Sequence, residues 1–456
     1  MIPMTLAEIA RVLDARLDAV PDPEALVTMP AAVDSREVVP GGLFAATAGA
    51  RVDGHDYAAK AVADGAVAVL AARPVGVPAI VVADVQSALG VLAGHVLARL
   101  GCTVIALTGS VGKTTTKDLL AQILEPHAPT ISTDRSFNNE LGLPLTVLRA
   151  DAGTRYLVLE MGAGRKGDLT YLTGIAPPRV SLVLNVGAAH VSRMGGGLAD
   201  VAEAKGELVA ALPPDGYAVL NADDPYVAGM AGRTEAKIVW YGTSPDAGVR
   251  AEGVRMGEGA TPAFDLVTPS GRARVELGLI GEHQVANALG AAAAAVTLGL
   301  SAGEIAAGLN AAGRRSSGRF EITERPDGVT VINDAYNANP ESMRAGLRAF
   351  RALAGGRRTI AVLGAMGQQA DASRDRHAQV GRLAAELGIE VLIAVGEGDP
   401  QAMAREAADA GVVVHPVEGV AEASRLAAEL IRPGDVVFVK ASSEYGLGVC
   451  ARELAT

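Results

Sequence analysis

Cysteine, aromatic residues and positive charge are all scarce in this chain. Its 456 residues include two cysteines, Cys102 and Cys450, which excludes a disulfide framework and favours a reducing, cytoplasmic compartment. Aromatic residues make up 3% of the chain, so the cores must be built from Ala, Val and Leu, as is typical of parallel α/β layers. The net charge of −11 argues against a nucleic-acid-binding protein, which would normally present a basic face.

Long apolar runs are also missing. Residues 1–10 do not combine a basic region with an apolar core, so we predict no signal peptide. The longest apolar stretch, 288–300, is rich in Ala and shorter than the roughly 18 residues that a membrane span needs. We therefore expect a buried helix there, no membrane insertion and, as the simplest assembly, a monomer.

Lysine is scarce as well. Of the 40 Lys and Arg residues, seven are lysine, which leaves 33 arginines. In a chain with so strong a preference for arginine, a retained lysine is more often one whose amine is needed. The seven are Lys60, Lys113, Lys117, Lys166, Lys205, Lys237 and Lys440.

Strand-length apolar runs alternate with helix-length segments along most of the chain. This alternation predicts an α/β fold with mostly parallel sheets, and the length requires more than one core. We expect three domains: a small α/β domain over 1–98, a central domain over 99–312 that carries a phosphate-binding loop, and a doubly wound, Rossmann-like domain over 313–456. The last begins at the linker-like segment G-R-R-S-S-G.

The expected elements follow from the same patterns. In the first domain they are helices over 6–17 and 57–63 and strands over 66–71 and 79–82. In the central domain they are strands over 103–107, 156–160, 180–186, 217–221 and 237–241, an antiparallel excursion within 242–280, and an Ala-rich helix after His283. In the last domain they are strands over 329–333, 359–363, 390–395, 412–415 and 435–439.

A glycine-rich segment, T-G-S-V-G-K-T-T-T at 108–116, lies between the first central strand and a helical pattern that begins near Lys113. Such a turn points backbone N–H groups at a phosphate, and the helix N-terminus adds its positive end. Lys113 can reach the outer phosphates of a nucleoside triphosphate, and Thr114 can place its hydroxyl on Mg²⁺. Leu107 stands where G-x-x-x-x-G-K-[ST] has its first glycine. The predicted ATP-binding residues here are Thr108, Gly109, Ser110, Val111, Gly112, Lys113, Thr114 and Thr115.

Two residues after apolar strands are candidate metal ligands. Glu160 ends L-V-L-E, and His190 follows another strand in L-N-V-G-A-A-H. The carboxyl ends of parallel strands face the crevice in which open α/β sheets bind ligands, so Glu160 beside a triphosphate would hold Mg²⁺ directly or through water. An ordinary strand-end acid and a histidine satisfied at the sheet edge are the alternatives.

Lys205 lies in A-E-A-K-G-E-L on a helical pattern. Composition alone favours a solvated surface lysine. The alternative is a carbamate formed with CO₂, which would turn the amine into an oxygen ligand for Mg²⁺, and arginine cannot undergo this change.

Four further residues are candidate nucleotide contacts. His283 and Asn287 are four residues apart and share one helix face, where capping and packing compete with adenine recognition by the Asn287 amide. Asp334 follows a predicted strand, a position suited to a ribose hydroxyl, and Arg319 could lie over a phosphate.

Taken together, these residues resemble the Mur ligases of bacterial peptidoglycan synthesis. The matching segments are D-S-R-E-V-V-P-G-G-L-F (34–44), D-G-H-D-Y (53–57), T-G-S-V-G-K-T-T-T-K (108–117), F-N-N-E-L-G-L-P-L-T (137–146), L-E-M-G-A (159–163), N-V-G-A-A-H (185–190), A-K-G-E (204–207), L-N-A-D-D-P (220–225) and N-D-A-Y-N-A-N-P-E-S-M (333–343). The segments at 137–146 and 334–340 are most similar to the member that adds D-alanyl-D-alanine.

The resemblance implies an amide ligase that uses ATP and two Mg²⁺ ions. Its partners would be UDP-N-acetylmuramoyl-tripeptide, whose terminal carboxylate becomes an acyl phosphate, and D-alanyl-D-alanine, whose amine attacks it. The first domain would bind the UDP end.

Carried over residue by residue, the resemblance assigns roles to the candidates. Lys113, Glu160, His190 and Lys205 would be catalytic, and Thr114, Glu160, His190 and a carbamylated Lys205 would surround the metal ions. The remaining nucleotide contacts would be Asn287, Arg319, Asp334 and Asn337. The substrates would contact Ser35, Arg36, Asn138, Asn139, Tyr336 and Asn339.

The chain departs from the family pattern at four places. Ala188 replaces a proline and Gln284 an asparagine, the loop 363–370 lacks the usual acidic residues, and Ser443 stands where arginine is common. The last two changes lie in the domain expected to receive the amine, so they bear on the acceptor rather than on the ATPase core.

Three alternatives compete with this assignment. They are a sibling ligase that adds one amino acid, a folylpolyglutamate synthase-like enzyme, and a non-catalytic nucleotide-binding regulator on the same fold. The segments within 34–57 speak against the folate enzyme. Joint retention of Lys113, Glu160, His190 and Lys205 speaks against the regulator.

Overall fold

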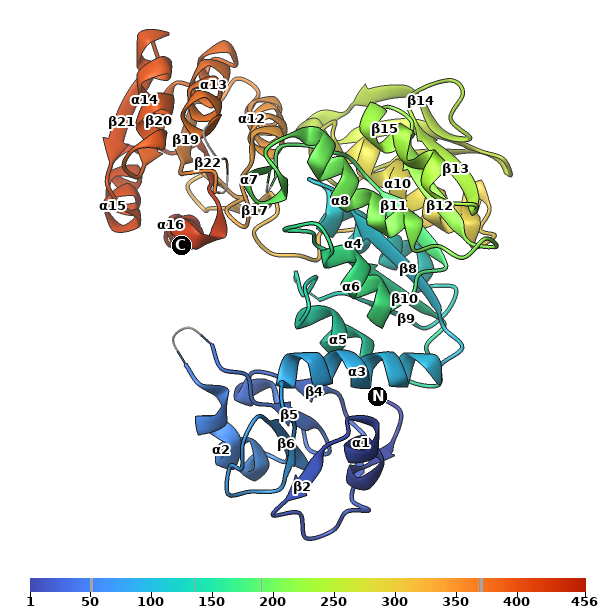
Figure 1. Cartoon of the computed structure of the whole chain (residues 1–456). Helices are drawn as coiled ribbons and strands as arrows, with labels where there is room; N and C mark the ends of the chain where they lie inside the picture. Colours follow the sequence, from blue (N-terminus) through green and yellow to red (C-terminus); the bar gives the residue numbers. More distant parts are fainter. Residues whose placement is uncertain (50–51, 135, 190, 368, 370–371) are drawn as a thin grey trace.

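The computed structural model describes residues 1–49, 52–134, 136–189, 191–367, 369 and 372–456. These residues form four sheets, and the chain folds into three α/β domains with mostly parallel sheets, which confirms the predicted fold class. Figure 1 shows the N-terminal domain (blue) and the C-terminal domain (orange to red) bordering different sides of the central domain.

The N-terminal domain holds a five-stranded sheet of order β2-β7-β6-β5-β4 and a two-stranded sheet of β1 and β3. Its elements are β1 (Met4–Thr5), α1 (Leu6–Val12), β2 (Arg16–Asp18), β3 (Leu26–Val27), β4 (Ala31–Ala32), η1 (Ser35–Glu37), β5 (Leu43–Ala45), η2 (Gly54–Tyr57), α2 (Ala58–Ala63), β6 (Ala68–Ala71), β7 (Ala79–Val81) and α3 (Val85–Ala98).

The predicted helix over 6–17 is wrong in its second half. The helix α1 ends at Val12, Asp14 adopts a left-handed φ of 49°, and residues 16–18 pair with β7 as strand β2. A left-handed residue interrupts a right-handed helix, and aspartate tolerates that conformation better than most residues do.

The central domain is built on a nine-stranded sheet of order β16-β15-β14-β13-β12-β11-β8-β10-β9. Its elements are β8 (Thr103–Thr108), α4 (Lys113–Leu124), β9 (Thr130–Ser132), α5 (Gly142–Val147), β10 (Tyr156–Glu160), α6 (Asp168–Ile175), β11 (Val180–Val183), α7 (Val191–Met194), α8 (Leu198–Ala210), β12 (Tyr217–Asn221), α9 (Pro225–Ala228), η3 (Gly229–Arg233), β13 (Lys237–Gly242), β14 (Val249–Met256), η4 (Glu258–Ala260), β15 (Pro262–Thr268), β16 (Gly271–Glu276), α10 (Gln284–Thr297) and α11 (Ala302–Ala311).

All five strands predicted for this domain are present, although β11 ends at Val183 rather than at residue 186. The strands β14, β15 and β16 pair in antiparallel fashion, which confirms the excursion predicted within 242–280. The edge strand β9, with three residues that are all partly exposed, was not predicted.

The C-terminal domain contains a six-stranded sheet of order β17-β18-β22-β19-β20-β21, which is parallel except at β17. Its elements are β17 (Glu321–Glu324), β18 (Thr330–Asn333), α12 (Pro340–Ala354), β19 (Thr359–Leu363), α13 (Ser373–Glu386), β20 (Val391–Val395), α14 (Asp399–Asp409), β21 (Val413–Val417), α15 (Val420–Leu430), β22 (Val436–Lys440), η6 (Ser443–Tyr445) and α16 (Gly448–Leu454). The five predicted strands are confirmed to within two residues at each end, and the antiparallel edge strand β17 was not predicted.

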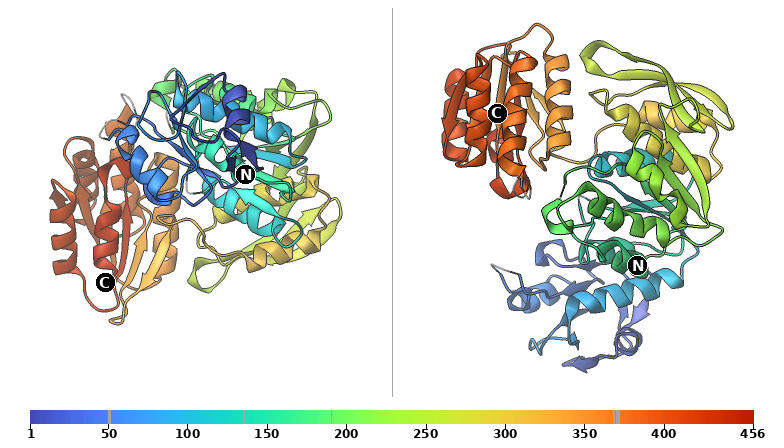
Figure 2. Two further views of the ribbon diagram at one scale, coloured as in Figure 1. Left: turned by 90° about the horizontal axis from the view of Figure 1, so that it is seen from below. Right: turned by 45° about the horizontal axis from the view of Figure 1, so that its top comes forward.

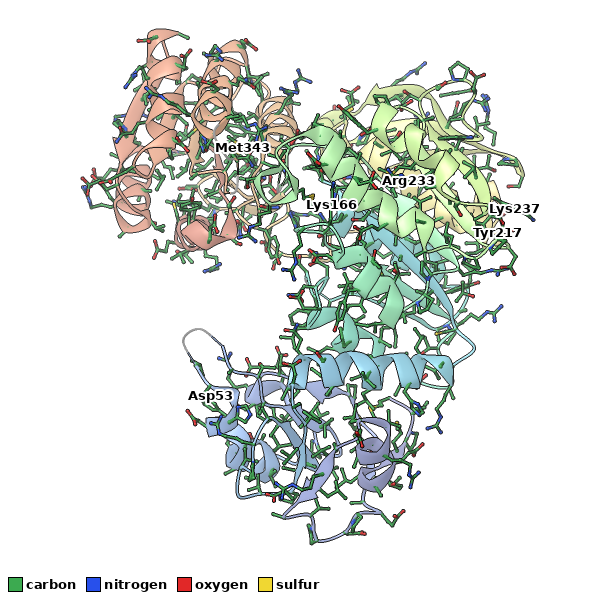
Figure 3. All side chains as sticks on the ribbon, in the orientation of Figure 1. Asp53, Lys166, Tyr217, Arg233, Lys237 and Met343 are labelled. Carbon is green, nitrogen blue, oxygen red and sulfur yellow. The ribbon has the colours of Figure 1, made fainter. Side chains whose placement is uncertain are left out.

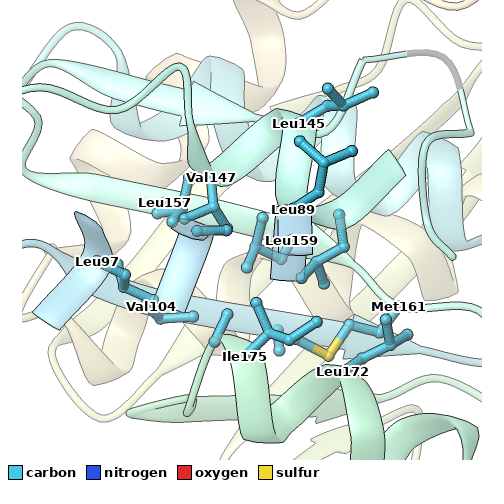
Figure 4. Packing of buried hydrophobic residues seen from close by; sticks show 14 of the residues in the cluster. Leu89, Leu97, Val104, Leu145, Val147, Leu157, Leu159, Met161, Leu172 and Ile175 are labelled. Atoms are coloured by element: carbon cyan, nitrogen blue, oxygen red, sulfur yellow. The ribbon is translucent and has the colours of Figure 1, made fainter. Parts of the chain in front are cut away.

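The N-terminal and central domains share one hydrophobic core. Leu89 and Leu97 of helix α3 belong to the same buried cluster as Leu157 and Leu159 of strand β10, and the helix packs against α5 and α6 (Figure 4). Burial of this kind contributes roughly 25 cal/mol per Å² of apolar surface, so it fixes the two domains to each other.

The C-terminal domain has its own buried clusters, on both faces of its sheet. It stands beside the central domain in the views of Figure 2. The chain between them runs along helix α4, where three polar side chains spaced about one turn apart hold the linker. Asp118 accepts from the Ser316 hydroxyl at 2.7 Å, the Gln122 amide bonds Gly313, and Glu125 pairs with Arg315.

None of the helices in the described ranges is both long and apolar enough to cross a membrane.

The contact between helices α4 and α11 can be tested by stability measurements, because helix α11 holds both a glycine in the contact and a glycine outside it. A Cβ at Gly308 would lie 2.8 Å from Ile123 Cα, whereas nothing lies within 4 Å of a Cβ at Gly303. Gly308→Ala should destabilise the protein by about 1–3 kcal/mol because the helices must separate. Gly303→Ala should be neutral or stabilise it by up to about 1 kcal/mol. Thermal unfolding midpoints measure both, and equal midpoints would contradict the packing described here.

Candidate active site

The phosphate-loop segment follows β8, which lies between β10 and β11 as the third strand from the β9 edge of the central sheet. The chain leaves β8 through α4 to the edge strand β9, returns to β10, and then places β11 on the other side of β8. The carboxyl ends of β8, β10 and β11 therefore meet where the strand order reverses, which is the usual ligand-binding position in open α/β sheets.

The loop itself is tightly held. The side chain of Asn185, just after β11, accepts hydrogen bonds from Ser110 N at 3.0 Å and Val111 N at 2.9 Å. Gly112 has a φ of 82°, and a Cβ there would lie 2.2 Å from Asn287 Oδ1, so only glycine fits. Lys113 Nζ donates to Gly109 O at 2.8 Å, which places the ammonium against its own loop.

Glu160 ends β10 beside this loop and is 1% exposed. Asn138 Nδ2 donates to Glu160 Oε1 at 2.6 Å, while Glu160 Oε2 is buried and has no hydrogen-bond partner among the described residues. Thr108 Oγ1, also buried, lacks a partner within the same residues. Unsatisfied buried oxygens are costly, and a cation would satisfy them, so the donor set fits Mg²⁺.

Two lysines lie close to each other at this site: Lys113 is partly buried and Lys205 is buried. Burial lowers the pKa of Lys113, an effect that Glu160 opposes and Arg319 adds to. Burial lowers the pKa of Lys205 well below its usual value, and the charge of Lys113 adds to that effect. Lys205 is 2% exposed on helix α8, which rules out the alternative of a solvated surface lysine.

Arg319 reaches the phosphate loop from the C-terminal side of the linker. Its Nη2 donates to Thr114 Oγ1 at 3.2 Å, and its guanidinium lies 4.3 Å from the centre of the Tyr336 ring. Tyr336 therefore contacts the arginine, a role that its motif did not reveal. Such stacking holds the guanidinium over the face of the ring.

Lys440 organises the segment after β18. Its Nζ donates to Asp334 Oδ2 at 2.6 Å and to Asn337 O at 2.8 Å, and it is 2% exposed. Burial lowers the pKa of Lys440, while Asp334 acts in the opposite direction. Lys440 was missed as a site residue, although its place among only seven lysines was a usable signal.

Asn287 and His283 lie together at the start of helix α10. The Asn287 amide donates to Gln284 Oε1 at 2.8 Å, and its oxygen accepts from Thr116 of helix α4 at 3.4 Å. The His283 side chain is exposed, and its Nε2 lies 3.1 Å from the amide nitrogen of Gln284.

Several cavities border this arrangement within the described residues. One of about 70 Å³ lies between residues 110–115 and Arg319, Asn337, Asn339 and Ser342. A second of about 470 Å³ extends from Thr114 past Asp134, Ser136 and Phe137 to Arg315–Ser317 and Tyr336. A third of about 210 Å³ is lined by Ala189, Asn337–Asn339, Gly367 and Ser442–Glu444.

The structure does not bring every predicted residue to this site. Ser35 and Arg36 lie in the N-terminal domain on η1, where Arg36 pairs with Asp34. Asn139 Oδ1 accepts from Gly142 N at the start of helix α5. His190 lies outside the described residues, and so do parts of the loop 363–370. Within the described residues, no three His, Cys, Asp or Glu side chains gather as a metal-binding group.

Three family models match successive parts of the chain. The model of the Mur ligase family catalytic domain matches residues 32–96, that of the Mur ligase middle domain matches 107–295, and that of the Mur ligase glutamate ligase domain matches 318–443.

Individual relatives match along the whole length. The chain is 45% identical to UDP-N-acetylmuramoyl-tripeptide–D-alanyl-D-alanine ligase of Mycobacterium tuberculosis (strain ATCC 25618 / H37Rv), over all of this chain and 98% of that protein. It is 36% identical to the protein of the same name from Escherichia coli (strain K12), over 87% of each. A crystal structure of MurF from Acinetobacter baumannii matches with a TM-score of 0.86 at 31% identity, over 99% of both chains.

A second solved structure, MurF ligase from Thermotoga maritima in complex with ADP, matches with a TM-score of 0.79 at 27% identity, over 94% of this chain and 97% of that one. The resemblance found in the sequence is thus confirmed by family models, relatives and structures that agree along the full chain. The protein belongs to the Mur ligase family.

Proposed function

We propose that the protein is an ATP-dependent ligase that joins D-alanyl-D-alanine to UDP-N-acetylmuramoyl-tripeptide, as the names of its relatives state for them. The observation that carries this proposal is the cavity between residues 110–115 of the central domain and Arg319, Asn337 and Asn339 on the other side of the linker. A triphosphate bound there would contact both the phosphate loop of the central domain and the C-terminal domain, which is expected to receive the amine.

The chemistry has two steps. A terminal carboxylate oxygen of the tripeptide attacks the γ-phosphorus of ATP, and ADP leaves. The amine of the dipeptide then attacks the acyl carbon, loses a proton, and phosphate departs with the carboxylate oxygen that joined it. Lys113 and Arg319 are the cations of this chain placed to hold the transferred phosphoryl group.

The metal ions are part of the proposal. Mg²⁺ would supply positive charge between the triphosphate and the carboxylate. We expect the two ions to be held by the Thr114 hydroxyl, His190, a carbamylated Lys205 and the Glu160 oxygen that has no partner among the described residues. A carbamate forms when a neutral amine attacks CO₂ and releases a proton, and the lowered pKa of Lys205 favours that neutral amine.

The remaining assignments are extended from the family motifs. Ser35 and Arg36 would contact the UDP end, and Asn138, Asn139, Tyr336 and Asn339 would line the path of the peptide or acceptor. Asn287, Asp334 and Asn337 would hold the adenine and ribose. Domain limits at 98 and 312, a monomer and a cytoplasmic reaction complete the proposal.

The ligation is tested by asking whether ATP hydrolysis depends on both substrates. Phosphate release from ATP should require UDP-N-acetylmuramoyl-tripeptide and D-alanyl-D-alanine together, and mass spectrometry should find their amide product. An acceptor panel with meso-diaminopimelate, L-lysine and glutamate separates the siblings. Turnover with a single amino acid, or none with any acceptor, would overturn the proposal.

The carbamate is tested at Lys205. Lys205→Ala should lower kcat by at least about a hundredfold, because a ligand for a catalytic cation is lost. A short-chain carboxylate added to the assay should restore part of the activity by replacing the carbamate oxygens. The control is Lys237→Ala, an exposed lysine over the ring of Tyr217 at the far edge of the central domain (Figure 3). Full activity of Lys205→Ala would refute the carbamate.

A further inference from the structure

We propose that Glu341, in the first turn of helix α12 of the C-terminal domain, is a positioning residue for the phosphate loop of the central domain. It acts through the segment Asn185–Ala189, which lies between the two. This proposal rests on the proposed function for its consequence, since it concerns how firmly the loop holds a nucleotide.

One side of this segment is bonded to the phosphate loop. Besides the contacts of Asn185 with Ser110 and Val111, the hydroxyl of Ser110 holds Gly187 at both backbone groups. It donates to Gly187 O at 3.1 Å and accepts from Gly187 N at 2.8 Å. Any displacement of Gly187 is therefore transmitted to Ser110.

The other side of the segment is held by Glu341. Its Oε1 accepts from Ala188 N at 3.0 Å. A Cβ on Gly187 would lie 2.9 Å from Glu341 Cδ, so the carboxylate fits closely against the glycine backbone. Gly187 and Ala188 are thus held between Ser110 of one domain and Glu341 of another.

A simpler role for Glu341 is a favourable charge at a helix N-terminus, which needs no contact with the central domain. The burial of one carboxylate oxygen indicates that Glu341 has more than this role. Glu341 Oε2 is buried and has no hydrogen-bond partner in the part of the chain that the structure describes. A buried unsatisfied carboxylate oxygen costs free energy that an exposed first-turn acid would not incur, so the contact with Ala188 must offset it.

The position of α12 makes this contact relevant to the nucleotide. Asn339 and Ser342, in the same turn as Glu341, line the cavity formed by residues 110–115. When the first turn of α12 is in place, it closes that cavity and fixes Gly187–Ala188 at once. The Glu341 side chain therefore couples the order of the phosphate loop to the position of the C-terminal domain.

Two substitutions separate positioning from charge. Glu341→Gln keeps an oxygen that can accept from Ala188 N but removes the charge, whereas Glu341→Asp keeps the charge but is one methylene too short to reach. We expect Glu341→Asp to weaken binding of a fluorescent ADP analogue with Mg²⁺ about tenfold and Glu341→Gln by less than about threefold. The control is Glu422→Asp, in the first turn of helix α15, which should change nothing.

The opposite ranking, or wild-type affinity in both variants, would overturn the proposal. A double-mutant cycle adds a second criterion. Ser110 and Glu341 both bond to the same segment, so the two substitutions should not act independently. The affinity loss of Ser110→Ala combined with Glu341→Asp should be smaller than the product of the two single fold-losses, and a loss equal to that product would contradict the coupling. Thermal unfolding midpoints establish that each variant is folded. The binding assay needs no ligation, so absence of ligase activity in the wild type would overturn the proposed function and leave this test intact.

Discussion

A triphosphate and a carboxylate are both anions, so bringing them together requires positive charge and the exclusion of water. The candidate site is organised around that constraint. Lys205 is buried and Lys113 is partly buried in the same region, where desolvation strengthens electrostatic interactions but also lowers the pKa of each amine. A carbamate on Lys205 would remove one of the two positive charges and add a ligand for a cation. Glu160 accepts a hydrogen bond from Asn138 at one oxygen. Its other oxygen has no partner among the described residues and could bind such an ion.

The two outer domains are attached to this site in different ways. The N-terminal domain shares a continuous apolar core with the central sheet through helix α3, so separating them would expose buried leucines. The contacts between the central and C-terminal domains include hydrogen bonds and ion pairs, at Thr114–Arg319, Ala188–Glu341 and along helix α4. Polar contacts can exchange with water at little net cost. Arg319 and Glu341 of the C-terminal domain both contact the phosphate-loop region.

Much of the fold followed from sequence patterns because buried parallel strands are continuous apolar runs. The runs at 103–107 and 359–363 are strands for this reason. The edge strands β9 and β17 were missed because exposed edges carry polar residues and no such run. The end of α1 was missed because it depends on one backbone conformation, at Asp14.

The residues of the candidate site also fall into those that local sequence predicts and those that it does not. The phosphate loop and Glu160 were predictable because strand, turn and helix place them by local chemistry. Local sequence could not show that Tyr336 stacks on Arg319, that Lys440 holds Asp334, or that Lys205 is buried, because these depend on contacts between distant segments. The scarcity of lysine was the one compositional signal for Lys205 and Lys440.

The central claim is that the phosphate loop serves to activate a carboxylate. The most direct measurement follows an oxygen atom. If the terminal carboxylate of UDP-N-acetylmuramoyl-tripeptide is labelled with ¹⁸O at both oxygens, the acyl phosphate transfers one of them to the phosphate that is released. Mass spectrometry of that phosphate should find a single ¹⁸O for each amide bond formed. Unlabelled phosphate accompanying amide formation would contradict the account.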